Sequence, residues 1–161
     1  MRAEGIQCPV RLSIPQASPQ QMQPVEFLNP SWCSLRSVNA DGYSEPKEPV
    51  RAVKKHQDVI EEVSLRTITT CVQLKLSEEW EGCQFPNLKK ADFSECFHDS
   101  GAGAEQALGA VSASELLEEV SFGGSHEVPG EAWKRWQGST FPNLKKANFR
   151  GCFYESGAGA E

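Results

Sequence analysis

Histidine and cysteine are the residue types that most often carry enzyme or metal chemistry, and here they are scattered through a chain of 161 residues. The three histidines, His56, His98 and His126, lie far apart, and none belongs to a recognisable motif with a paired nucleophile. The six cysteines form no C-x-x-C pair, and no histidine lies at zinc-ligand spacing from two of them. The sequence therefore predicts a protein that is not an enzyme and that holds no metal or other cofactor.

One glycine-rich stretch, Ser100 to Gly103, raises the question of a phosphate-binding loop. It lacks the Lys-Ser/Thr pair of a P-loop, and it lacks the preceding strand and later acidic residue of a dinucleotide fingerprint. The same letters return at Ser156 to Gly159, which indicates an element of an internal repeat. We therefore predict no nucleotide site.

The charge balance excludes further classes. A formal net charge of -6 argues against a nucleic-acid binder, which needs a basic surface, and against an anionic membrane. No apolar run reaches the 18 or so residues that span a bilayer, and the N-terminal letters hold no continuous apolar region of a secretory signal. We expect a cytoplasmic protein with free thiols.

A repeated stretch organises the chain. Phe85 to Cys96 reads FPNLKKADFSEC and returns as FPNLKKANFRGC from Phe141 to Cys152. Apolar or small residues occupy positions one, four, seven, nine and twelve of both copies, which is the spacing of a leucine-rich repeat. Positions seven and nine of that spacing lie on one side of a short strand, because side chains alternate along a strand.

The same template can be placed on six units. Its seventh positions are then spaced by 28, 25, 28, 29 and 27 residues, near the period of long-helix repeats (roughly 20–29 residues). Positions seven and nine of the six units are Val10 and Leu12, Val38 and Ala40, Val63 and Leu65, Ala91 and Phe93, Val120 and Phe122, Ala147 and Phe149. A pentapeptide-repeat β-helix is the rival interpretation, but only about fifteen consecutive residues of either copy fit it, and each coil of that fold needs about twenty.

Two unit types alternate, because DVIEEVSL from Asp58 resembles ELLEEVSF from Glu115, whereas the FPNLKKA units lie between and after them. This double repeat, with its Gly-Ala-rich helix starts, resembles the ribonuclease-inhibitor-like class of leucine-rich repeats. The resemblance implies an α/β solenoid of about five repeats of 25–29 residues, with a curved parallel sheet on the concave side and helices on the convex side. The chain departs from the family pattern because no Asn stands at position twelve of any unit.

The resemblance covers residues 32–161, and we expect residues 1–31 to be a degenerate repeat or a poorly ordered leader. Glu161 aligns with Glu105 in the middle of a repeat, and no polar cap is visible, so a fragment of a longer solenoid with fraying ends is expected.

Helices are expected on the outer side of each strand. Helical spacing of apolar residues predicts one from Ala104 to Val111 and a second after Pro129, closed by Gly138. A third is predicted over Pro49 to Gln57, ending in a lysine pair. A fourth is predicted to begin with Ser77 as its N-cap, with Trp80 facing inward. A short or frayed helix is expected over Ser18 to Leu28.

The concave strand face would be formed by the polar residues that flank positions seven and nine. Arg11, Ser13 and Gly123 also flank these positions. The candidate partner-binding residues are Asn39, Asp41, Glu62, Ser64, Arg66, Lys90, Asp92, Ser94, Glu119, Ser121, Lys146, Asn148 and Arg150. Strand spacing stacks them into columns about 4.8 Å apart, with mixed charges that suit a polar protein partner.

Two other residue classes have competing interpretations. The four tryptophans could stack on a ligand, but their place at helix and repeat starts favours core packing, and Trp80 and Trp136 align across the double repeat. The Lys89–Lys90 and Lys145–Lys146 pairs could contact phosphate or nucleic acid, but in an acidic chain a solvated face is the more common explanation.

The leading hypothesis is a non-enzymatic module that binds an unidentified protein partner through the concave face, without nucleic acid or membrane. The alternative is a structural spacer or fragment with no binding face, able to associate end to end through uncapped repeats. A third hypothesis, a substrate receptor in ubiquitin ligation, is implied by the family and would need an F-box-like segment that residues 1–31 do not show.

Overall fold

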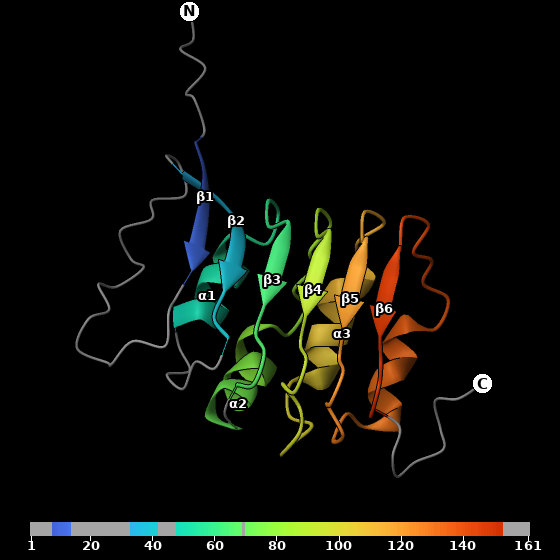
Figure 1. Ribbon diagram of the computed structural model, residues 1–161. Helices are drawn as coiled ribbons and strands as arrows, with labels where there is room; N and C mark the ends of the chain where they lie inside the picture. The colour runs from blue at the N-terminus through green and yellow to red at the C-terminus, as the bar shows by residue number, and fades with distance from the viewer. Residues whose placement is uncertain (1–7, 14–32, 42–47, 69, 153–161) are drawn as a thin grey trace, which may run out of the picture.

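A parallel sheet in strict chain order is the frame of the molecule (Figure 1). The computed structural model describes residues 8–13, 33–41, 48–68 and 70–152. Its six strands are ordered β1-β2-β3-β4-β5-β6. They are β1 (Cys8–Ser13), β2 (Cys33–Asn39), β3 (Glu62–Ser64), β4 (Lys90–Asp92), β5 (Glu119–Ser121) and β6 (Lys146–Asn148).

Equivalent residues of neighbouring strands lie opposite one another. Val38, Val63, Ala91, Val120 and Ala147 are paired in a single line across β2 to β6. The predicted seventh positions of these five strands are therefore in register. The four from β2 to β5 are between 1% and 3% exposed, because their side chains enter the core.

The predicted register of β1 is wrong by three residues at Val10 and by two residues at Leu12. Leu12, expected at position nine, pairs with Val38 at position seven, and Val10 pairs with Leu35. An irregularity between Val10 and Arg11 shifts the register within β1. Arg11 and Ser13 consequently align with Ser37 and Asn39.

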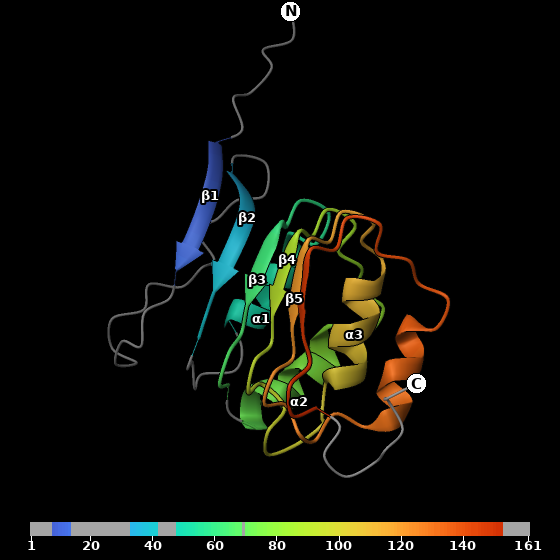
Figure 2. The same ribbon diagram turned by 45° about the vertical axis from the view of Figure 1, so that its right-hand side comes forward.

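Helical segments cover one face of the sheet, and we call the other face the open face (Figure 2). Along the chain each helical segment packs on the next one, from α1 to α2, α3 and finally η3. The segments are α1 (Glu48–Lys55), α2 (Thr70–Glu79), α3 (Ala104–Ser112) and the 3₁₀ helix η3 (Gly130–Trp136). A parallel sheet with helices after its strands is an α/β arrangement, as predicted.

Three of the expected helices occur where the sequence placed them, and one does not. α1 ends in Lys54 and Lys55, and α3 begins after Gly103, whose φ is 83°. Ser77 is not an N-cap, because α2 begins at Thr70 and Ser77 lies in its last turn. The expected helix over Ser18 to Leu28 lies outside the described residues.

Gln73 explains why the start of α2 was missed. It is fully buried, and its Nε2 donates a hydrogen bond to the carbonyl of Cys96, whereas Leu74 beside it is 51% exposed. The apolar stripe that marks an amphipathic helix is therefore broken in α2.

Aromatic rings fill the space between the sheet and the helices. Trp80 and Phe93 are fully buried, and Phe93 stacks on Phe122 with ring centroids 5.1 Å apart. The Trp80 indole donates a hydrogen bond to the carbonyl of Val50 at 3.0 Å. Trp136 donates in the same way to Leu108, at 2.8 Å. Core packing of Trp80 is thus confirmed, whereas Trp32 lies outside the described residues.

The chain turns sharply after β3, β4, β5 and β6, four residues beyond each seventh position. Thr67, Glu95, Gly124 and Gly151 occupy these places with φ of 53°, 56°, 75° and 83°. Only glycine adopts this left-handed conformation without steric cost, so Thr67 and Glu95 are held there by their surroundings. The backbone N–H groups of Thr67 and Glu95 each donate to a carbonyl on the next unit, at 3.0 and 2.8 Å.

Within the described part of the chain, no helix has the length and apolar character required to cross a membrane. The same residues contain no group of three or more His, Cys, Asp or Glu side chains that could hold a metal ion.

Candidate binding surface on the open face

A shallow groove of about 540 Å³ runs across the open face over β2 to β6. Its lining is contributed by Ser37, Val38, Asn39, Glu62, Val63, Ser64, Lys90, Ala91, Asp92, Glu119, Val120, Ser121, Lys146, Ala147 and Asn148. Because each strand contributes one short segment in register, like positions form rows that cross the strands.

The first row alternates in charge. Glu62, Lys90, Glu119 and Lys146 are aligned by the strand register. Glu119 lies between two lysines, with its Oε1 3.9 Å from Lys90 Nζ and 3.2 Å from Lys146 Nζ. These groups are about one third to three quarters exposed, so the row is both internally paired and open to a partner.

A second set of alternating charges lies immediately before the first residue of each strand from β3 to β6. Lys89 Nζ is 3.0 Å from Glu61, and Lys145 Nζ is 3.0 Å from Glu118. The hydrogen bond from Lys89 lowers the pKa of Glu61, and the hydrogen bond from Lys145 lowers the pKa of Glu118. The two lysine pairs, predicted as a solvated face, therefore form ion pairs with Glu61, Glu118 and Glu119.

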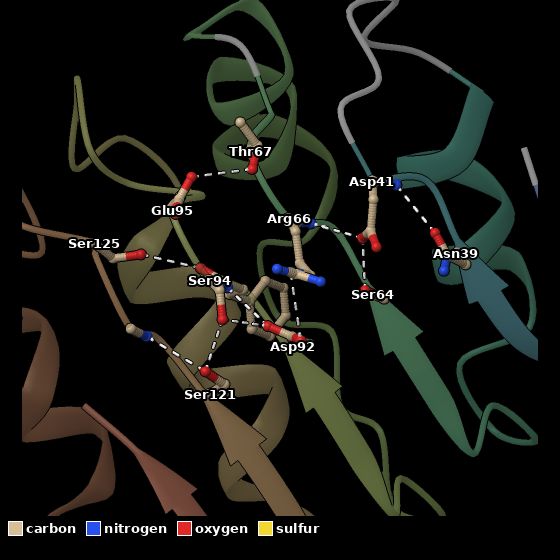
Figure 3. Close-up of polar contacts among 12 residues, drawn as sticks. Asn39, Asp41, Ser64, Arg66, Thr67, Asp92, Ser94, Glu95, Ser121 and Ser125 are labelled. Atoms are coloured by element: carbon tan, nitrogen blue, oxygen red, sulfur yellow. Dashed lines mark hydrogen bonds and ion pairs between the residues drawn. The ribbon is translucent and has the colours of Figure 1, made fainter. Parts of the chain in front are cut away.

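The next row of the groove is neutral or acidic and consists of Asn39, Ser64, Asp92, Ser121 and Asn148. Figure 3 shows how this row connects to the turns beyond the strands. Asp41 accepts hydrogen bonds from Ser64 Oγ at 2.6 Å and from the backbone N–H of Arg66 at 3.0 Å. Its carboxylate thus fixes the chain where β3 ends.

A second carboxylate, at a different position of the template, also accepts two hydrogen bonds, and here both come from its own unit. Asp92 accepts hydrogen bonds from Ser94 Oγ at 2.6 Å and from the Ser94 backbone N–H at 3.0 Å. Ser94 Oγ lies 2.7 Å from Ser121 Oγ, and Arg66 Nε lies 3.7 Å from Asp92 Oδ2 (Figure 3). A serine hydroxyl has one donor hydrogen and two acceptor lone pairs, so Ser94 and Ser121 can accept a further hydrogen bond from a ligand.

Nine of the thirteen candidate residues line the groove, and four do not. Asp41, Arg66, Ser94 and Arg150 follow the strands and lie beyond the groove lining. Ser37 was not among the candidates but lines the groove, where its Oγ donates to Glu62 at 3.1 Å. Ser37 occupies the same template position as Glu62, Lys90, Glu119 and Lys146, and this shared position could have predicted it from the sequence. The side chains of Arg11 and Ser13 lie outside the described residues.

The thiols at position twelve belong to the core and not to this surface. Cys96 is fully buried, and burial raises the pKa of its thiol well above the ordinary value. Burial also raises the pKa of Cys152 to about 11, and its Sγ lies 2.9 Å from the carbonyl of Phe122. Such thiols are poor nucleophiles, because the reactive form is the thiolate.

No family model, no curated protein and no solved structure matches this chain. The functional argument therefore rests on the geometry and chemistry of the described residues.

Proposed function

We propose that this chain is a leucine-rich-repeat solenoid that binds a protein partner through the groove of its open face. The repeat interpretation is supported by hydrogen bonds between neighbouring units that recur one double repeat later. The Nδ2 atoms of Asn87 and Asn143 donate to the carbonyls of Asp58 and Glu115, at 2.6 and 2.9 Å. Trp80 and Trp136 donate to the preceding helical segment in the same way.

The observation that carries the binding proposal is the two-row groove itself. One row presents alternating carboxylates and ammonium groups, and the next presents hydroxyl, amide and carboxylate groups. A partner with charges of both signs can exchange ion pairs with the first row and hydrogen bonds with the second. Electrostatic complementarity of this kind contributes more to specificity and association rate than to affinity.

A charge-inverted variant tests the proposal. Glu62→Lys/Lys90→Glu/Glu119→Lys/Lys146→Glu keeps the alternation along the row, and therefore the attraction between neighbours, while it reverses every charge that a partner meets. We expect proteins crosslinked to the wild type in native lysate to be lost from this variant at equal folding by circular dichroism.

A matched control inverts one ion pair on the helical side. Arg135→Glu/Glu105→Arg exchanges an exposed pair between η3 and α3 without touching the groove. This control is expected to retain the partner. Loss of the partner from both variants, or from neither, would contradict binding through the open face.

The spacer alternative is favoured by one specific observation. The groove charges are already paired within the chain, as Glu119 is with Lys90 and Lys146, so the surface needs no partner to balance its charge. If the wild type and the inverted variant capture the same proteins, or none, the spacer function is the better explanation.

A further inference from the structure

β6 differs from β3, β4 and β5 in being exposed along its whole length. Lys146, Ala147 and Asn148 are all exposed, whereas Val63, the residue of β3 that aligns with Ala147, is only 2% exposed. Among the described residues no strand pairs with the outer edge of β6. That edge presents backbone N–H and C=O groups in the arrangement that accepts an added strand.

An apolar flank accompanies this edge. Phe141, Leu144 and Phe149 are only partly buried, although their equivalents one double repeat earlier, Phe85 and Leu88 among them, are fully buried. Trp133 and Trp136 are also partly buried and pack on Phe149, at 5.5 and 5.8 Å between ring centroids. A strand added at β6 would thus cover apolar surface as well as pair backbone groups.

The charge pattern of the sheet specifies the chemistry of that strand. Pairs of glutamates and pairs of lysines alternate from strand to strand. Lys89–Lys90 lies between the pairs Glu61–Glu62 and Glu118–Glu119. Lys89 reaches back to Glu61 on the β3 side, at 3.0 Å, and Lys90 reaches forward to Glu119 on β5, at 3.9 Å.

Within the residues that the structure describes, Lys145 and Lys146 have a Glu pair on one side only. Lys145 and Lys146 both reach back, to Glu118 at 3.0 Å and to Glu119 at 3.2 Å. Lys146 is also more exposed than Lys90, with 74% of its side chain accessible against 49%. A strand bearing two carboxylates on the far side would give Lys146 the forward partner that Lys90 has.

We propose that the outer edge of β6 binds an acidic segment of another protein as an additional parallel strand. The register requires two consecutive carboxylates followed by an apolar residue, a polar residue and a second apolar residue, as in Glu118 to Phe122 of this chain. The carboxylates pair with Lys145 and Lys146, and the two apolar side chains cover the flank of Phe149.

A second copy of this chain fits the edge less well. Arg11 occupies the position of β1 that is equivalent to Lys146, so head-to-tail addition would bring two cations to adjacent register positions. Pairing of two β6 edges would gather the Lys145 and Lys146 residues of both copies in one interface. Like charges on adjacent strands are destabilising.

Peptide binding to the full chain tests the proposal. The probe is a labelled peptide with the sequence of residues 114–124, SELLEEVSFGG, and its control carries Lys at both positions of the Glu pair. We expect fluorescence anisotropy at low salt to give a dissociation constant on the order of fivefold lower for the Glu peptide, because two exposed ion pairs distinguish them. Lys145→Gln/Lys146→Gln should bring the two peptides to equal affinity.

Amide hydrogen exchange identifies where the peptide binds. Binding at the edge is expected to slow exchange in β6, and alternate N-methylation of the peptide should abolish binding because it removes the N–H groups of an added strand. The open-face variant Glu62→Lys/Lys90→Glu should bind the Glu peptide as the wild type does.

Equal affinity of both peptides for the wild type would overturn the proposal, as would no measurable binding of the Glu peptide. Protection confined to β3 and β4 would instead assign the peptide to the open face. A concentration-dependent dimer in sedimentation that the Glu peptide does not dissociate would show that a second copy occupies the edge. Either result would also refute the inference.

Discussion

Truncation of Phe93 tests how tightly the space between sheet and helices is packed. Phe93 is fully buried and contacts three aromatic rings, with centroid distances of 5.1 Å to Phe122, 6.1 Å to Trp80 and 6.4 Å to Phe97. Phe93→Ala removes buried apolar area and leaves a cavity that these rigid rings cannot fill. We expect the free energy of unfolding to fall by about 3–5 kcal/mol.

Phe149 is the matched control, because it occupies the same place one double repeat later. It is only partly buried, so Phe149→Ala opens a space that water can enter, and mainly the transfer free energy is lost. That cost is expected to be about 1–2 kcal/mol. The free energy of unfolding of both variants is measured by urea unfolding followed by circular dichroism. If Phe93→Ala does not fold, Phe93→Leu and Phe149→Leu give the same comparison with a smaller loss of side-chain volume. Equal costs at the two positions would refute the difference in packing.

Three further predictions concern backbone strain, pH and thiol access. Thr67→Gly removes a left-handed β-branched residue at φ 53° and should stabilise the fold by about 0.5–1 kcal/mol in urea unfolding. Gly124→Ala, at φ 75°, adds a Cβ that would lie 2.9 Å from Glu95 Cγ, and it should cost about 1–2 kcal/mol. The opposite signs would contradict the argument. Burial, and secondly the charge of Lys55, lowers the pKa of His56 from its ordinary 6.5. The unfolded state therefore binds more protons than the folded state, and the free energy of unfolding should fall as the pH drops below about 6.5. His56→Gln should lose this pH dependence. In a variant whose other four cysteines are serine, Cys96 and Cys152 should react with Ellman's reagent only as fast as the chain unfolds, and rapid labelling of the native protein would contradict their burial.

The sequence predicted the sheet well because its signal is strong and local. Apolar residues at positions seven and nine recur at nearly constant spacing, and β2 to β6 lie in the predicted register. The helix after Gly103 was predictable for the same reason, since its alanines and leucine fall on one face and are buried. The alternating row from Glu62 to Lys146 followed directly from that register.

The features that were missed depend on contacts between units. The start of α2 could not be found from periodicity, because buried Gln73 is stabilised by a hydrogen bond to the Cys96 carbonyl, 23 residues away. The irregularity in β1 follows Pro9 and Val10, and that proline was the one letter that could have marked it, because proline in a strand is confined to edges, first positions and bulges. The left-handed turns after the strands are signalled by Gly124 and Gly151 in two units, but Thr67 and Glu95 conceal the pattern in the other two.

The double repeat has a physical cause in the charges at the strand starts. In-register parallel strands bring equivalent residues to about 4.8 Å, so identical units would stack four glutamates or four lysines in one line. Like charges directly opposite one another on adjacent strands are destabilising. Alternation of Glu61–Glu62 and Glu118–Glu119 with the two lysine pairs places opposite charges on neighbouring strands, and four of these contacts are ion pairs. The same repulsion between like charges determines which strand fits beyond β6. It favours a strand with carboxylates and excludes a strand with lysines.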